Sequence, residues 1–219
     1  MYSWSGKMKK ATIISVILLF ATGCQSVYYG TMEKFGKHKR DILVDRVEDA
    51  RDSQQETKEQ FASALDKFKS VVNVPSGELQ AKYDLLKSEL DKSETKASAV
   101  KKRISDVEDV AKALFDEWTK ELEQYKNPDL RASSEKKLDQ TRARYTLLIN
   151  AMKKAETKIE PVLSAFRDQV LFLKHNLNAQ AVASLQSEVT TMEADISKLI
   201  AEMEKSIAEA DSFIKTMQE

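Results

Sequence analysis

The chain contains few of the side chains that most often carry catalysis or bind metals: its 219 residues include one cysteine and two histidines. His38 lies near the start of the first expected helix and His175 near the end of the third, so a shared metal site is not expected. Neither histidine belongs to a Glu-x-x-His pair of the kind found in di-iron helical bundles. The sequence also contains no Gly-rich phosphate-binding loop and no nucleophile elbow. It therefore predicts no catalytic residue, no metal site and no cofactor.

The single cysteine, Cys24, follows a segment with the layout of a secretory signal. Lys9 and Lys10 precede the apolar run Ile13–Phe20, which is too short to span a bilayer because a spanning helix needs about 20 apolar residues. Residues 21–24, Ala-Thr-Gly-Cys, resemble the lipobox of bacterial lipoproteins, in which cleavage precedes the cysteine and the sulfur receives a diacylglycerol. We therefore expect residues 1–23 to be a cleaved signal peptide and Cys24 to carry the lipid, with palmitate among its acyl chains.

The residues after Cys24 predict where the anchored chain resides. Gln25 and Ser26 lack the aspartate that, by resemblance to other bacterial lipoproteins, favours retention in the inner membrane. We expect the chain on the periplasmic face of the outer membrane, where two acyl chains suffice for stable attachment. Residues 24–36 contain two glycines and are expected to form the lipidated cysteine and its tether.

A group of four basic residues lies close to the expected anchor: Lys34, Lys37, Lys39 and Arg40. Such a group can contact anionic lipid headgroups. An ordinary solvated start of a helix explains it equally well, because Asp41 and Asp45 follow at once. Both interpretations stay open from the sequence.

The composition favours long helices. Only five glycines and three prolines occur in the chain, and 32% of its residues are charged, which is typical of long helices and coiled coils. The 35 basic and 35 acidic residues balance, and removal of the signal would remove three lysines and no acid. The remaining weakly acidic chain is a poor candidate for nucleic-acid binding, which depends on neutralising phosphates.

Apolar residues recur at alternating spacings of three and four along the expected domain, residues 37–219. Stop signals occur near three positions: at Pro75, at Asn127-Pro128 and at the pair Asn176 and Asn178. Short links between helices of similar length make antiparallel neighbours. The sequence therefore predicts an all-α fold, an elongated antiparallel helical bundle or coiled coil of three to four long helices in a single domain.

Two of the expected helix boundaries depend on a choice. The apolar pattern passes Pro161 without losing phase, so we expect a kink inside one helix there. The pattern changes phase after Leu177, but no glycine or proline supports a turn at Asn176 and Asn178. A single helix that changes its neighbours is the alternative to a turn at that point.

Polar residues interrupt the apolar pattern at one expected height of the bundle. If the first two helices fold back near position 75, residue i faces roughly residue 150 − i, and Gln54 and Thr57 then lie level with Ser93 and Glu94. Pro161 is expected near the same level. This polar waist fixes the alignment of the helices at some cost in stability, or it is a weak point that opens to admit a partner or ligand.

Three stretches carry a resemblance to a known family: Met32–Val47, Ala113–Trp118 and Phe166–Asn178. They are similar to an uncharacterised family of Gram-negative coiled-coil lipoproteins known only as a domain of unknown function. The resemblance covers the whole expected mature chain. It implies an envelope location and a helical fold, and it assigns no activity and no site residue.

These observations favour a non-catalytic structural or interaction protein of the cell envelope over an enzyme. The expected partners are the membrane, through the lipid anchor, and either an envelope protein or a second copy of the chain. The alternative is a helical-bundle carrier that holds a small hydrophobic or lipid ligand between opened helices.

Overall fold

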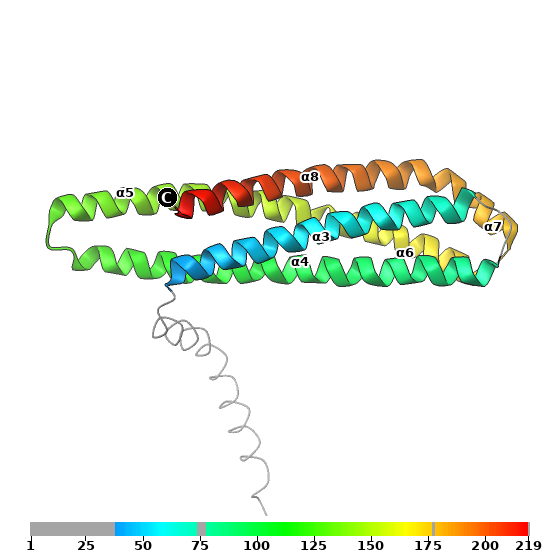
Figure 1. Cartoon of the computed structure of the whole chain (residues 1–219), viewed down its shortest axis with the longest axis horizontal. Helices are drawn as coiled ribbons and strands as arrows, with labels where there is room; N and C mark the ends of the chain where they lie inside the picture. The colour runs from blue at the N-terminus through cyan, green and yellow to red at the C-terminus, as the bar shows by residue number, and fades with distance from the viewer. Residues whose placement is uncertain (1–37, 74–77, 177, 219) are drawn as a thin grey trace, which may run out of the picture. The chain divides into compact units, whose positions relative to one another are not determined.

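A computed structural model of the chain describes residues 38–73, 78–176 and 178–218 (Figure 1). The chain divides into two compact units, residues 1–42 and 43–219. Of the first unit, only the short stretch from His38 is described, where the backbone N–H of His38 donates a hydrogen bond to Asp41 at 3.3 Å. The expected signal peptide, Cys24, and the tether all lie outside the described residues.

The second unit is built from helices alone within its described residues. Long helices dominate, and short segments join or extend them. In chain order the elements are α3 (Lys39–Asn73), α4 (Leu79–Glu121), the 3₁₀-helix η1 (Leu122–Gln124), α5 (Pro128–Thr157), α6 (Ile159–His175), α7 (Ala179–Ser184) and α8 (Gln186–Gln218). The predicted all-α fold is confirmed.

Ion pairs join the neighbouring long helices along their lengths. Asp49 of α3 meets Arg103 of α4 at 3.1 Å, and Glu56 meets Lys96 at 2.6 Å, so the two helices run antiparallel. α3 also runs antiparallel to α8, because its pairs with that helix advance in opposite directions: Arg51–Asp211, Lys58–Glu204 and Lys69–Glu193. With α4 against α5 and α6, and α5 against α8, the second unit is a closed up-down-up-down bundle.

The centre of the bundle is filled by aliphatic and aromatic side chains. The largest fully buried ones come from every long helix and include Phe61, Phe68, Leu86, Ile104, Leu148, Met152, Leu173 and Leu199. Phe68 of α3 and Phe166 of α6 meet across the bundle edge to face, with ring centroids 6.3 Å apart. Each such side chain contributes about 1.5–3 kcal/mol when removed from water, so burial in this core holds the helices together.

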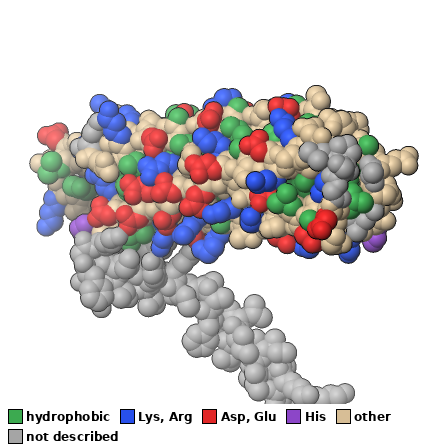
Figure 2. All heavy atoms as spheres, turned by 45° about the vertical axis from the view of Figure 1, so that its right-hand side comes forward, with side chains coloured by type: hydrophobic (Ala, Val, Ile, Leu, Met, Phe, Trp, Pro, Cys, Tyr) green, Lys and Arg blue, Asp and Glu red, His purple; other side chains and the backbone are tan. Residues whose placement is uncertain are grey.

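The outer surface mixes both signs of charge. Figure 2 shows Lys and Arg side chains interspersed with Asp and Glu side chains over one face, with hydrophobic side chains only in small separate areas. The surface of a solvated helical bundle has this character.

The turn between α4 and α5 follows from local sequence signals. The side chain of Asn127 accepts hydrogen bonds from the backbone N–H groups of Asp129 at 2.9 Å and Leu130 at 3.2 Å, and Pro128 takes the first helical position. Asparagine as a cap followed by proline is a favoured helix start. The predicted turn at Asn127 is confirmed.

The turn between α6 and α7 is present as well. α6 ends at His175, and the side chain of Asn178 accepts a hydrogen bond from the backbone N–H of Ala181 at 2.8 Å. Asn178 therefore caps the next helix without help from glycine or proline. The alternative of one continuous helix through this position is wrong.

One detail of the helix ends differs from the expectation. The helical hydrogen-bond pattern is interrupted at Lys158, so Pro161 is preceded by a break between α5 and α6 rather than lying in one kinked helix. The cause is the proline, because its missing N–H and its ring deprive the carbonyl of Thr157 of a helical partner. At the start of α4 the cap position is Glu78, whose side chain makes no capping bond.

The paired ends of α4 and α5 form a two-helix hairpin that continues beyond the end of α8 (Figure 1). The indole N–H of Trp118 donates to Ser134 Oγ at 2.9 Å. The rings of Phe115 and Tyr145 meet edge to face at 5.4 Å, and the guanidinium of Arg142 lies 5.5 Å from the centroid of the Phe115 ring. These contacts join α4 to α5 along the hairpin, and α8 still flanks α5 at Arg144, which bonds Thr216.

Candidate functional site

Among the described residues of the second unit, six polar side chains are buried, and together they form what we call the central polar layer: Ser53, Gln54, Thr57, Glu89, Ser93 and Ser206. They come from α3, α4 and α8. Polar groups inside a bundle cost free energy unless each finds a hydrogen-bond partner. The layer is therefore the part of the core whose presence needs an explanation other than hydrophobic burial.

Gln54 links α3 to α8 at the centre of the layer. The hydroxyl of Ser206 donates to Gln54 Oε1 at 2.8 Å, and both side chains are fully buried. The amide nitrogen Nε2 of Gln54 has no hydrogen-bond partner. An unsatisfied buried donor costs about 1–3 kcal/mol, so Gln54 fixes the position of α8 against α3 at a cost in stability.

Two hydroxyls at the interface of α3 and α4 make their main hydrogen bonds within their own helices. Thr57 Oγ1 donates to the carbonyl of Ser53 at 2.7 Å and lies 3.4 Å from the carbonyl of Lys96. Ser93 Oγ donates to the carbonyl of Glu89 at 2.8 Å. Such bonds to the preceding turn let small polar residues occupy a helix interface without an unpaired group.

Glu89 is the one carboxylate of the layer, and its side chain is only 6% exposed. One of its oxygens accepts from Lys92 Nζ at 2.8 Å, and the other accepts from Gln60 Nε2 at 2.8 Å. Burial by itself raises the pKa of Glu89, but the hydrogen bonds from Lys92 and Gln60 outweigh it and hold the pKa below its ordinary value. Glu89 is therefore a charged, paired group between α3 and α4.

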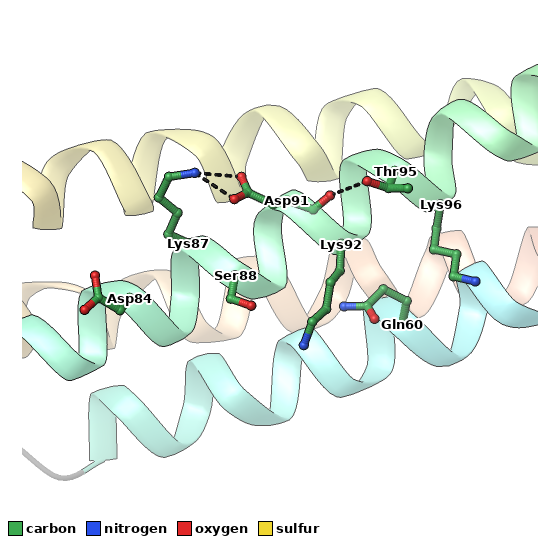
Figure 3. A pocket seen from close by; sticks show the side chains of 8 residues that line it. All are labelled: Gln60, Asp84, Lys87, Ser88, Asp91, Lys92, Thr95 and Lys96. Carbon is green, nitrogen blue, oxygen red and sulfur yellow. Dashed lines mark hydrogen bonds and ion pairs between the residues drawn. The ribbon is translucent and has the colours of Figure 1, made fainter.

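An open depression of about 540 Å³ lies over this part of α4. Figure 3 shows that all its lining side chains except Gln60 come from α4, with Lys87 and Asp91 directed away from α3. Lys87 Nζ binds both carboxylate oxygens of Asp91, at 2.9 and 2.7 Å, while Lys92 and Lys96 pair with Glu89 and Glu56. Because its three lysines already have carboxylate partners, the depression offers no free cation to an anionic ligand.

A second open groove, of about 500 Å³, lies between α4 and the break at Lys158. Arg167 spans it, with Nε 2.5 Å from Glu94 and a terminal nitrogen 2.6 Å from Glu160. Hydrogen bonds with Glu94 first and Glu160 second raise the pKa of Arg167. This ion-pair network holds α6 against α4 directly after the interruption near Pro161.

The structure brings together part of the predicted polar waist. Gln54, Thr57 and Ser93 lie in the central polar layer, whereas Glu94 lies in the neighbouring α4–α6 groove and Pro161 is exposed on α6. The sequence analysis missed Ser53, Glu89 and Ser206, which are buried in the layer. The spacing of Ser206, three residues after Met203 and four before Ala210, is the signal that could have found it.

The other predicted site residues are not members of this layer. Lys39 and Arg40 begin α3 in the first unit, and both take part in interactions there. Lys34, Lys37 and Cys24 lie outside the described residues. His38 and His175 are both exposed, at the start of α3 and the end of α6.

The described residues contain neither a metal-binding cluster nor a membrane-spanning helix. Across residues 38–73, 78–176 and 178–218, no three His, Cys, Asp or Glu side chains come together in a way that could hold a metal ion. Over the same ranges, none of the helices combines the length and the apolar character needed to cross a bilayer.

Comparisons with known proteins place the chain by family. No curated protein and no solved structure shows a significant match to it. A family model does match, over residues 28–217, and that span includes both helices of the hairpin and the whole central polar layer. The chain therefore belongs to the family described as "Protein of unknown function (DUF2959)".

Proposed function

We propose that this protein is a lipid-anchored, non-catalytic structural or interaction protein of the cell envelope, held on the periplasmic face of the outer membrane by Cys24. The single observation that carries the non-catalytic part is how the bundle uses its charged groups. The paired carboxylates and cations at the helix interfaces join one helix to another, as Asp49–Arg103, Arg51–Asp211 and Arg167–Glu94 do. Such groups serve the rigidity of a bundle rather than a substrate.

The two open hollows support the same proposal. Both are lined largely by charged or polar side chains, and the cations at their centres, among them Lys87 and Arg167, already bind carboxylates. A carrier for a hydrophobic ligand needs a concave apolar site that removes most of the ligand from water. A scaffold needs only a rigid body with a surface of its own.

The anchoring part depends on the sequence around Cys24. Fractionation of cells that express the wild-type chain or the Cys24→Ser variant tests it. We expect the wild type in the outer-membrane fraction and the variant outside it, because the variant lacks the thiol that receives the diacylglycerol and so lacks the acyl chains that give stable attachment. A variant that sediments with membranes as firmly as the wild type would show that the lipid anchor is wrong.

Native mass spectrometry tests the scaffold against the carrier. Protein purified from its own membrane in mild detergent is expected to carry only its covalent acyl chains. A stoichiometric, non-covalent lipid or other apolar molecule that survives purification would contradict the scaffold and support the carrier. The Cys24→Ser protein is the matched control, because it lacks covalent lipid and has the same bundle.

A further inference from the structure

At the end of the bundle where α8 finishes, the tip of the α4–α5 hairpin extends further than the other parts of the second unit. From the Asp49–Arg103 ion pair, α4 continues for 18 residues to Glu121. In the same direction α3 continues for only six residues before it reaches Leu43, the first residue of the second unit. At about 1.5 Å per residue, α4 therefore passes Leu43 by roughly 18 Å. Figure 1 shows the hairpin extending beyond the C-terminal end of α8 at the same end of the bundle.

The tip presents two large side chains to the outside. Tyr125 is 41% exposed and Leu130 is 57% exposed, on either side of the turn that Asn127 caps. The hydrogen bonds from Asp129 and Leu130 to Asn127 give the turn a defined conformation. Two exposed residues on a rigid turn can therefore bind a surface with little loss of conformational entropy.

The charges around the tip balance. Three basic and three acidic side chains surround the turn, and all are exposed: Lys120, Lys126, Arg131, Glu121, Glu123 and Asp129. A purely anionic partner gains nothing from such a set. A zwitterionic phospholipid surface offers both signs of charge at its headgroups and an apolar layer beneath them, and tyrosine is enriched at that boundary in membrane proteins.

The length of chain ahead of the bundle permits this contact. Eighteen residues separate Cys24 from Leu43, and even a partly extended segment of that length reaches further than the roughly 18 Å by which the hairpin passes Leu43. We propose that the tip of the α4–α5 hairpin, through Tyr125 and Leu130, rests on the zwitterionic phospholipid surface that carries the lipid anchor. The proposal rests on the lipid anchor of the proposed function. In this arrangement one end of the bundle contacts the membrane.

Depth-dependent fluorescence quenching tests the contact in the full-length lipidated protein. The protein is reconstituted in phosphatidylethanolamine-rich vesicles that contain a nitroxide-labelled lipid. A nitrobenzoxadiazole probe is attached to Gln124→Cys at the tip or, as the matched control, to Gln186→Cys at the opposite end, where α8 begins. The lipid thioether at Cys24 leaves no other thiol to label.

We expect the lipid quencher to reduce the emission of the tip probe and to leave that of the Gln186→Cys probe unchanged. Replacing both Tyr125 and Leu130 by serine is expected to abolish the loss at the tip. Leu147→Ser is the control for that pair, because Leu147 is 61% exposed on α5 and lies away from the turn; it is expected to leave the loss unchanged.

Three results would overturn the inference while the anchor stands, as shown by sedimentation of the wild type but not of Cys24→Ser with the vesicles. The first is no loss of emission from the tip probe. The second is an equal loss of emission at both ends, which means that the bundle lies flat on the membrane. The third is a blue shift of the tip probe without lipid quenching, which means contact with a second copy. If the wild type fails to sediment with the vesicles, the proposed function fails together with the inference.

Discussion

Different interactions hold together the two parts of the second unit: the bundle of four long helices, which we call the body, and the two-helix hairpin formed by the paired ends of α4 and α5. The body buries large side chains such as Phe61 and Phe68 completely and also encloses six polar side chains. The hairpin has one helix against one other, and specific contacts such as the Trp118–Ser134 hydrogen bond hold it. From this comparison we expect most of the stability to come from the body, and we expect the hairpin to open locally without unfolding the rest.

The largest expected effect comes from truncating the core of the body. Phe68→Ala removes a fully buried ring that contacts Phe166, and we expect the free energy of unfolding to fall by about 3–5 kcal/mol. Urea unfolding followed by circular dichroism measures it. Phe172→Ala is the control, because that ring is 42% exposed, and its effect should stay below about 1 kcal/mol. Equal losses for both variants would mean that the body has no dominant core.

The next effect has the opposite sign and concerns the central polar layer. Replacing Gln54 by leucine and Ser206 by alanine removes both bonded partners and the unpaired Nε2. We expect the unfolding free energy to rise by about 1–2 kcal/mol, because apolar replacement of a partly satisfied buried polar pair is often stabilising. Ser206→Ala alone is the control and should destabilise, since it leaves Gln54 with a second unpaired atom.

Hydrogen exchange on the same protein separates the two interpretations of the layer. If the polar side chains fix register, amides of residues 48–60 and 90–102 should be as protected as those around Leu114 and Leu148. If the layer is a weak point, the first two ranges should exchange well before the limit set by global unfolding. We expect equal protection, because most of the buried hydroxyls and Glu89 are bonded.

The parts of the fold that could be predicted are those with local causes. Asn127-Pro128 marks a helix start by its own capping chemistry. The turn before α7 was indicated by the change of phase after Leu177, and Asn178 caps the helix there. Gln54 and Thr57 were found because they occupy positions in the apolar pattern. The break at Lys158 was missed because the apolar phase continues past Pro161, and phase does not report one lost hydrogen bond.

Burial of the remaining residues of the central polar layer depends on which helices pack beside them, and the pattern of a single helix does not specify its neighbours. Glu89 lies beside the apolar pattern of α4, between Leu86 and Leu90, and it is buried where Gln60 of α3 binds it. A four-helix body covers a wider face of each helix than a two-helix contact does. For the same reason the sequence indicated Glu94 in place of Glu89, since Glu94 continues the pattern while Glu89 faces Gln60 of α3.

A fourth prediction compares the two asparagine caps. Asn127→Ala removes the acceptor of two backbone N–H groups at the hairpin tip, and Asn178→Ala removes the acceptor of one at the turn into α7. Each loss is expected to cost about 1 kcal/mol locally. For Asn127→Ala we expect faster hydrogen exchange confined to the hairpin, with the urea midpoint unchanged. A lowered midpoint for Asn127→Ala would show that the hairpin unfolds with the body.

The smallest effect is a pH dependence that only the body should show. The pKa of Glu89 is held below its ordinary value of 4.5 in the folded chain, so the native state binds fewer protons there than the unfolded chain does. The stability from its bonds to Lys92 and Gln60 is then fully present above about pH 5 and is lost as the pH falls through 4.5 toward the lowered native pKa. Glu89→Gln should flatten this decline in the free energy of unfolding, measured by urea titrations from about pH 6 to pH 3. Glu56→Gln is the matched control, because Glu56 also pairs with a lysine of α4 but its side chain is 59% exposed, and exposed ion pairs contribute little. If both variants decline with pH as the wild type does, Glu89 is not a charged member of the layer, and the contrast between a polar-centred body and a locally bonded hairpin loses its electrostatic part.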